Sequence, residues 1–196
     1  AYVAAWRAGP IYESLEHLPR PAAELFAAIQ NHSRSEQELL QESGHPNTYT
    51  YTKCLAEHLL SERRGNVPLA IVRPSIISVA WQRPFPGWID SAAAFAGCLL
   101  YTGLGVVRAW HADPAIRLDV VPVDVVADSI LDAAFVAPFP TPSEPVPIHF
   151  AAMGIENAMR IDMSALSTAQ HFQERLGHKA PTLFIGRNEH GFKYMD

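Results

Sequence analysis

The sequence predicts an α/β fold, an incomplete Rossmann-like parallel sheet with flanking helices. Short apolar runs, such as residues 69–72, are typical of strands that are buried in a parallel sheet. Segments with helical periodicity, such as residues 48–64, alternate with those runs along the chain. This alternation of strands and helices favours a parallel sheet that is covered by helices.

Capping and turn-forming residues delimit the predicted elements of the first half of the chain. Pro21 suits the first position of a helix, and a second helix stops near Gly44. Asn47 or Thr48 can cap the next helix, which Gly65 closes. The predicted elements are the end of a strand at 1–5, helices over 22–30, 35–41 and 48–64, a strand over 69–73 and an extended piece over 76–80.

The second half of the chain continues the alternation. Asp124 lies where it favours the N-terminal dipole of a helix, so we interpret it as a helix cap rather than a catalyst. Gly177 ends the last predicted helix. The predicted elements are a helix over 89–101, a strand over 118–121, a helix over 123–136, a proline-rich surface linker over 138–147, a strand over 147–151 and a helix over 164–176.

The composition excludes several classes of protein. A chain of 196 residues with 48% hydrophobic and 18% charged residues is globular and long enough for a sizeable core. The net charge of −5, with no basic run beyond Arg63 and Arg64, argues against a nucleic-acid partner. The histidines and cysteines lack zinc-site spacing, so we expect no metal. Cys54 and Cys98 lie in apolar helical contexts and are expected to be reduced core residues.

Residues 91–107 form an uncharged stretch that raises the question of a membrane span. The stretch is shorter than the roughly 20 apolar residues that a span needs, and it contains three glycines. We therefore interpret it as a buried helix, and membrane association is left open.

Tyr49 and Lys53 form the most informative pair in the chain. Residues four apart on a helix share one face, so the two side chains are expected to be neighbours. An ammonium next to a phenol favours the phenolate form. Such a tyrosine can exchange a proton with a carbonyl oxygen while a hydride moves at the carbon. Taken alone, the spacing is a weak signal, because an exposed helix pair has the same spacing.

Five pieces of sequence between Pro46 and Asp124 carry a family resemblance. They are Pro-Asn-Thr-Tyr-Thr-Tyr-Thr-Lys at 46–53, Ala-Glu at 56–57, Leu-Ala-Ile-Val-Arg-Pro-Ser-Ile at 69–76, Pro-Phe-Pro-Gly-Trp-Ile-Asp at 84–90 and Val-Pro-Val-Asp at 121–124. The proline-flanked Pro-Gly-Trp-Ile-Asp segment is much more particular than Tyr-x-x-x-Lys. In this order the pieces resemble the male-sterility branch of the extended short-chain dehydrogenases/reductases, whose best-known members are fatty acyl-CoA reductases.

The chain also departs from that family. No Gly-x-x-Gly-x-x-Gly turn for a cofactor pyrophosphate occurs, and Gly97, Gly103 and Gly105 do not follow a predicted strand. By the family's layout the catalytic Ser or Thr would precede Ala1. We therefore expect the chain to be a C-terminal fragment of a longer reductase, the C-terminal half of an extended short-chain dehydrogenase/reductase domain.

The resemblance implies catalytic roles for Tyr49 and Lys53. Tyr49 would be the general acid for the oxyanion that hydride attack forms. Lys53 would support Tyr49 and hold the nicotinamide ribose hydroxyls, so both residues also count as cofactor-binding. Tyr51 is not the candidate, because its partner four residues on is Leu55.

The resemblance further places Pro74, Ser75 and Ile76 against the nicotinamide, chiefly through backbone atoms. This agrees with the rule that ligands of open α/β sheets bind beyond the carboxyl ends of strands. Trp88 is expected to bind substrate, with a packing role as the alternative. Arg73 either pairs with a carboxylate in the fold or meets phosphate, and the sequence leaves both open.

The resemblance implies NADPH-dependent reduction of a long-chain fatty acyl-CoA thioester to an aldehyde or alcohol, as part of a longer chain in the cytoplasm. Residues 1–152 would be the C-terminal part of the NAD(P)-binding reductase domain, and residues 153–196 the start of a C-terminal substrate-side region. The alternatives are a thioester reductase domain that acts on a carrier-bound acyl chain and a non-catalytic truncated fragment.

Overall fold

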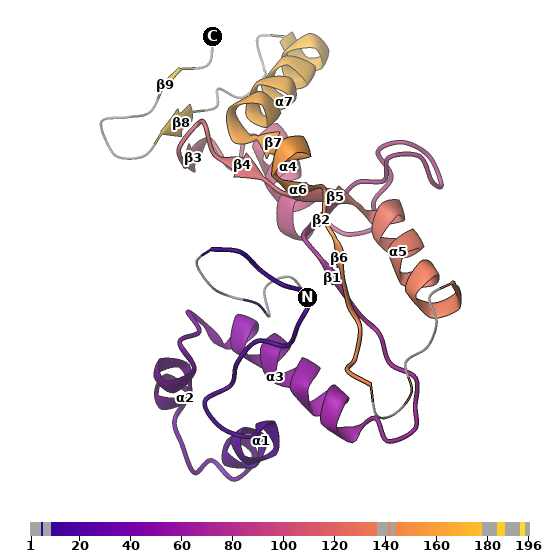
Figure 1. The fold of residues 1–196 in the computed structure, drawn as a ribbon. Coiled ribbons are helices and arrows are strands. Elements are labelled where there is room, and N and C mark those ends of the chain that lie inside the picture. The colour runs from indigo at the N-terminus through magenta and orange to yellow at the C-terminus, as the bar shows by residue number, and fades with distance from the viewer. Residues whose placement is uncertain are drawn as a thin grey trace. The chain divides into compact units, whose positions relative to one another are not determined.

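The computed structural model describes residues 5, 9–136, 141, 144–177, 184–186 and 193–194 (Figure 1). The chain divides into two compact units, which are unit 1 (residues 1–75 and 128–151) and unit 2 (residues 76–127 and 152–196). The strand end predicted at residues 1–5 lies outside the described residues, except for Ala5, and so does much of the predicted linker over 138–147. The predicted domain boundary after residue 152 stays a prediction.

Unit 1 begins with three helices whose ends follow the predicted capping signals. Ser35 caps the second helix and forms a capping box with Glu38, and Gly44 ends it in a left-handed conformation at φ 72°. The Asn47 side chain accepts a hydrogen bond of 2.9 Å from the Thr50 amide and so caps the third helix. The helices are α1 (Ala22–Gln30), α2 (Glu36–Ser43) and α3 (Thr48–Arg63).

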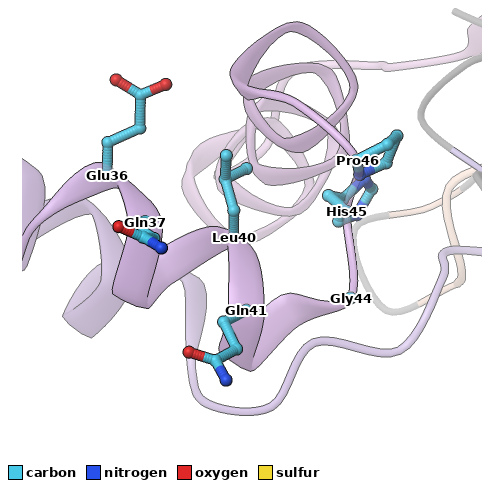
Figure 2. A pocket seen from close by; sticks show the side chains of 7 residues that line it. All are labelled: Glu36, Gln37, Leu40, Gln41, Gly44, His45 and Pro46. Atoms are coloured by element: carbon cyan, nitrogen blue, oxygen red, sulfur yellow. The ribbon is translucent and has the colours of Figure 1, made fainter.

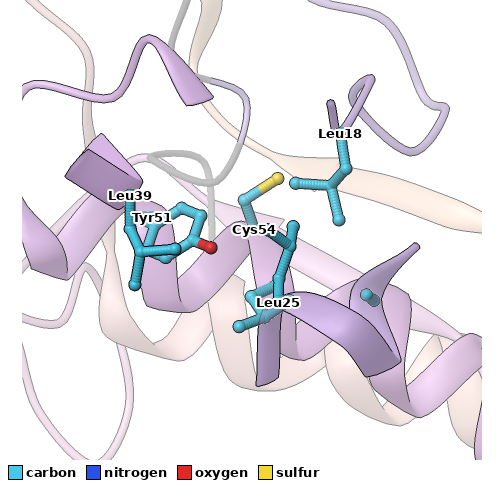
Figure 3. Packing of buried hydrophobic residues seen from close by; sticks show 7 residues of the cluster. Leu18, Leu25, Leu39, Tyr51 and Cys54 are labelled. Carbon is cyan, nitrogen blue, oxygen red and sulfur yellow. The ribbon is translucent and has the colours of Figure 1, made fainter. Parts of the chain in front are cut away.

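These three helices bury one apolar core, part of which Figure 3 shows in close-up. Leu25 of α1, Leu39 of α2 and Cys54 of α3 meet in this core together with Leu18 from the preceding loop. Cys54 and Leu25 are each about 1% exposed. The packed face of α3 is therefore fixed against α1 and α2, and its opposite face carries the polar side chains.

A pair of parallel strands completes the core of unit 1. Strand β1 (Ile71–Pro74) pairs in parallel with β6 (Ile148–Ala151), from Ile71 opposite Ile148 to Pro74 opposite Ala151. The last residues of helix α5 (Val123–Phe135) also belong to unit 1. Parallel pairing of strands that lie far apart in sequence confirms the α/β class.

Unit 2 contains short strands in parallel and antiparallel pairs. The elements are β2 (Ile76–Ser78), α4 (Ala94–Gly103), β3 (Ala109–His111), β4 (Arg117–Leu118), β5 (Val120–Pro122), α6 (Gly154–Asn157), β7 (Met159–Arg160), α7 (Ile161–Leu176), β8 (Phe184–Gly186) and β9 (Lys193–Tyr194). Strand β2 pairs in parallel with β5, and β3 pairs in parallel with β8. The pairs β4–β7 and β8–β9 are antiparallel. Helix α4 packs against β2 and α7.

Helix α4 begins later than the sequence predicts. It starts at Ala94 rather than near residue 89, because Ala93 is extended at ψ 166° and Ala94 has a φ of 47°. Its buried face contains Phe95, Ala96 and Thr102 and leaves Cys98 exposed, which corrects the expectation that both cysteines lie in a core. Among the described residues, no helix has both the length and the apolar character needed to cross a membrane.

Candidate active site

The N-terminus of helix α3 is held by a small hydrogen-bonded network. Besides the Asn47 cap, the Thr50 hydroxyl donates to the Asn47 carbonyl at 3.1 Å and shares a hydrogen bond of 3.0 Å with His45 Nδ1. Thr50 is buried, so this turn is anchored on its inner side. The anchored turn therefore fixes the orientation of Tyr49, the residue before Thr50, whose side chain points outward.

Tyr49 and Lys53 lie together on the outer face of this helix. The Lys53 ammonium is 5.6 Å from the centroid of the Tyr49 ring, a cation–π contact. Tyr49 is 58% exposed and Lys53 is exposed as well. The structure therefore brings the two predicted residues together on a surface that a ligand can reach, while their catalytic role stays a prediction.

Tyr51 serves a different purpose from Tyr49. It is 2% exposed and packs in the core of unit 1, with its ring centroid 5.8 Å from that of His45. Burial raises the pKa of the Tyr51 phenol, with a further rise from the Glu42 carboxylate. A buried tyrosine of this kind is unsuited to proton transfer with an incoming substrate, which supports the choice of Tyr49.

A buried ion pair connects helix α3 to strand β1. Arg73 Nη2 lies 2.7 Å from Glu57 Oε2, and Arg73 Nε lies 3.1 Å from Glu57 Oε1. The guanidinium also donates to the backbone carbonyls of Tyr12 and Ser14. Arg73 thus takes the first of its two predicted alternatives. Glu57 was not predicted to be part of the site, although its place one helical turn beyond Lys53 is a signal that could have identified it.

The predicted nicotinamide turn follows β1. Pro74 and Ser75 belong to unit 1 and Ile76 belongs to unit 2. The Ser75 amide donates to the Ala151 carbonyl at 3.1 Å, and the Ile76 amide donates to the Asp119 carbonyl at 3.1 Å. Because proline has no amide hydrogen, backbone contacts from this turn to a ligand would use carbonyl oxygens.

Trp88 lies in a loop that Asp124 organises. The Asp124 carboxylate accepts hydrogen bonds from the backbone amides of Trp81, Gln82 and Arg83 at 2.9, 2.8 and 3.0 Å. These hydrogen bonds, the one from Trp81 first, hold the pKa of the Asp124 carboxyl well below its usual range.

The far end of this loop folds back on its start. The Ala80 amide donates to the Trp88 carbonyl at 2.8 Å, and the Gly87 amide donates to the Ala80 carbonyl at 2.8 Å. Trp88 itself is half-buried. Asp124 therefore has a defined structural role in addition to its place in the first turn of α5, and substrate binding by Trp88 stays a prediction.

A pocket of about 690 Å³ lies beside helix α2, just before the candidate helix (Figure 2). Its lining includes Glu36, Leu40 and His45, but neither Tyr49 nor Lys53. The side chains of Glu36 and Gln41 extend away from the helix in Figure 2. This open hollow, whose lining is part polar and part apolar, is therefore not the site that the Tyr49–Lys53 pair defines.

The described residues fit one half of a nicotinamide dinucleotide. An exposed phenol, an exposed ammonium and backbone carbonyls are suitable partners for a ribose and a carboxamide. Gly97 and Gly103 lie within α4, and Gly105 follows that helix, so none of the three opens a strand-to-helix phosphate turn. Within the described part of the chain, no group of three or more His, Cys, Asp or Glu residues is placed to hold a metal ion.

The parallel strand pairs, their flanking helices and the Tyr49–Lys53 pair define a nucleotide-binding α/β domain of the Rossmann type. The family model described as "Male sterility protein", an NAD-binding domain, matches residues 1–130. The chain belongs to this male sterility protein family, which implies a nicotinamide cofactor.

Curated relatives agree with that family. Fatty acyl-CoA reductase 2 of Mus musculus is 48% identical over 83 residues, which cover 42% of this chain and 16% of the relative. Fatty acyl-CoA reductase 1 of Xenopus laevis is 33% identical over 162 residues, which cover 70% of this chain and 32% of the relative. Fatty acyl-CoA reductase 2 of Homo sapiens is 38% identical over 107 residues, which cover 55% of this chain and 21% of the relative. The chain thus spans no more than 32% of the length of these relatives.

Proposed function

We propose that this chain carries the catalytic helix of an NADPH-dependent reductase that acts on long-chain fatty acyl-CoA thioesters. The observation that carries the proposal is the exposed Lys53 ammonium, 5.6 Å from the ring centroid of the exposed Tyr49. Membership of the male sterility family and relatives named fatty acyl-CoA reductases supply the substrate class. The choice of NADPH over NADH and a cytoplasmic location are further parts of this proposal.

The proposed chemistry uses the phenol as a proton carrier. When bound, the nicotinamide supplies a hydride to the thioester carbonyl carbon. Tyr49 Oη donates its proton to the carbonyl oxygen as negative charge develops there. The ammonium of Lys53 lies beside the ring, where it stabilises the phenolate that proton donation leaves behind.

The thiol then leaves from the same carbon. Tyr49 Oη takes back the proton of the new hydroxyl, the carbon–sulfur bond breaks, and the departing thiolate takes a proton from solvent. The products are an aldehyde and free coenzyme A thiol. A second hydride and a second proton from Tyr49 would convert the aldehyde to an alcohol.

In this proposal Pro74, Ser75 and Ile76 face the nicotinamide through their carbonyl oxygens. The amides of Ser75 and Ile76 already donate hydrogen bonds within the structure and Pro74 has no amide hydrogen, so contacts to a carboxamide in this assignment use carbonyl oxygens as acceptors. Lys53 would hold the ribose hydroxyls, and Trp88 would contact substrate.

The test is loss of NADPH absorbance in the full-length protein after palmitoyl-CoA is added. Oxidation that depends on the acyl-CoA supports the proposal. Oxidation only with an acyl chain on a carrier protein would favour the thioester reductase alternative. A full-length protein that binds NADPH but oxidises it with neither substrate would contradict a catalytic role for the pair.

A further inference from the structure

A cavity of about 420 Å³ lies within unit 2, among strands β2, β5 and β7 and helices α4 and α7. This volume is within the range of small-molecule sites, about 300–1,000 Å³. No lining residue carries a charge. The apolar lining includes Phe95, Leu99, Val120, Met159 and Met163.

The cavity has a buried end and an exposed end. Phe95 is 7% exposed, whereas Met163 is 54% exposed. Four residues supply hydroxyl groups to the lining, of which Ser78 and Ser164 are buried, Thr168 is half-buried and Ser167 is exposed. A ligand would therefore enter past Met163 and end near Phe95.

The wall at the buried end is held in place by contacts outside the cavity. The ring of Trp110 meets that of Phe95 edge-on, with centroids 6.3 Å apart and planes at 77°. Trp110 Nε1 donates a hydrogen bond of 3.0 Å to the hydroxyl of Thr102, which is buried on α4 about two turns beyond Phe95. The cavity is thus preformed at this end, which lowers the entropy cost of binding.

We propose that this cavity binds the methyl-terminal end of an unbranched hydrocarbon chain, and that Phe95 and Leu99 set the chain length that it accepts. An uncharged lining favours an apolar occupant, because an unpaired charge is costly to bury. Methionine side chains adapt to a flexible chain better than branched ones do. The inference rests on the proposed function and identifies the part of the protein that selects among acyl chains.

The primary experiment measures binding without turnover. Saturated fatty acids of increasing length compete with a fluorescent fatty acid for the full-length protein. Each methylene that enters the cavity should strengthen binding by about fourfold. Affinity should then level off once the cavity is full. A series with no dependence on chain length would overturn the proposal.

Variants of the lining test where the methyl end of the bound hydrocarbon chain lies. Phe95→Ala enlarges the buried end, so the levelling-off point should move to longer acids. Leu99→Ala is a second enlargement, at a half-buried position, and should move the levelling-off point in the same direction. It provides the test if Phe95→Ala does not fold. Circular dichroism shows whether each variant is folded. Met163→Ala, at the exposed end, should weaken all chain lengths alike and leave that point unchanged. Leu104→Ala, on an exposed residue outside the lining, should change nothing.

The outcomes separate this inference from the proposed function. If folded Phe95→Ala and Leu99→Ala proteins keep the levelling-off point of the parent, the cavity does not hold the chain end, even where acyl-CoA reduction proceeds. If the point moves as expected while NADPH is never oxidised, the chain site stands and the proposed reduction fails alone.

Discussion

The guanidinium of Arg73 and the carboxylate of Glu57 form a buried ion pair that fastens the candidate catalytic helix to the strand behind it. Arg73 is 0% exposed and Glu57 is 6% exposed, and their closest atoms are 2.7 Å apart. The guanidinium also donates hydrogen bonds to the backbone carbonyls of Tyr12 and Ser14. The face that presents Tyr49 and Lys53 is therefore fixed relative to β1 by a contact that lies outside the site itself.

Breaking this pair should be strongly destabilising. Glu57→Gln leaves a buried guanidinium without its countercharge, so we expect the free energy of unfolding to fall by about 3 kcal/mol or more. Urea denaturation of the full-length protein measures the change. The control is Asp162→Asn, which breaks the exposed Arg160–Asp162 pair of 2.6 Å and should cost no more than about 1 kcal/mol. Equal losses in the two variants would contradict the structural role of Glu57.

Tyr49→Phe should abolish most of the proposed activity without affecting the fold. Loss of a general acid lowers turnover by about 100- to 10,000-fold, and the exposed ring leaves little packing to disturb. NADPH oxidation with palmitoyl-CoA measures the rate, and NADPH binding should stay near normal. A variant that retains more than about a tenth of the rate would remove Tyr49 from the acid role.

Tyr51→Phe is the matched control two residues along the same helix. Within the described structure the buried Tyr51 hydroxyl has no hydrogen-bond partner. Removing this hydroxyl should leave turnover unchanged. It should also stabilise the protein by about 1 kcal/mol, because the free-energy cost of burying an unpaired polar group is removed. Thermal unfolding tests the stability, and a marked loss of stability would show that the hydroxyl is satisfied.

Lys53→Ala should weaken both turnover and cofactor affinity, because the ammonium would stabilise the phenolate and hold the ribose. NADPH fluorescence titration and steady-state rates measure the two effects separately. Thr52→Ala changes an exposed neighbour on the same helix and serves as the control. If Lys53→Ala altered only solubility, the pair would be an ordinary exposed helix contact.

Asp124→Asn should release the start of the Trp88 loop. The asparagine keeps one acceptor oxygen but turns an NH₂ group toward amides that need acceptors, so hydrogen exchange at Trp81, Gln82 and Arg83 should rise by about tenfold or more. Asp132→Asn, exposed on the same helix, is the control. Unchanged exchange at all three amides would contradict the role of Asp124 in the loop.

The contribution of Asp124 to the stability of the loop should depend on pH, and the direction can be stated. Because the folded-state pKa of Asp124 is lowered, its stabilising contribution is present above the unfolded pKa of about 3.9 and is lost progressively as the pH falls below that value. The parent should therefore lose loop protection in acid, whereas Asp124→Asn should not show this loss.

The sequence predicted the ends of helices better than it predicted long-range contacts. Asn47, Gly44 and Gly65 mark helix ends through interactions within a few residues, so the boundaries of α2 and α3 were predictable to within about two residues. The pairing of β1 with β6 was not, because its partners lie more than 70 residues apart in the chain and no local pattern specifies them.

Helix α4 and the short strands show the same limit. The small residues after Ile89 favour a helix, but the segment that follows the loop held by Asp124 and Trp88 stays irregular until Ala94. Strands of two or three residues, such as β4 and β7, are too short for any periodicity to predict. At the candidate site, the adjacency of Tyr49 and Lys53 followed from helical spacing, whereas the Glu57–Arg73 pair required the fold.

Gly103 has a consequence for how this region of the protein can vary among relatives. The Phe172 ring of α7 occupies the space that a β carbon at position 103 would need, so no larger residue fits there unless that ring retreats. The two positions should therefore change together in evolution, and a Gly103→Ala exchange should be tolerated only beside a smaller residue at 172. Because α4 and α7 both border the cavity, such a coupled exchange would alter its width without touching a single residue of its lining.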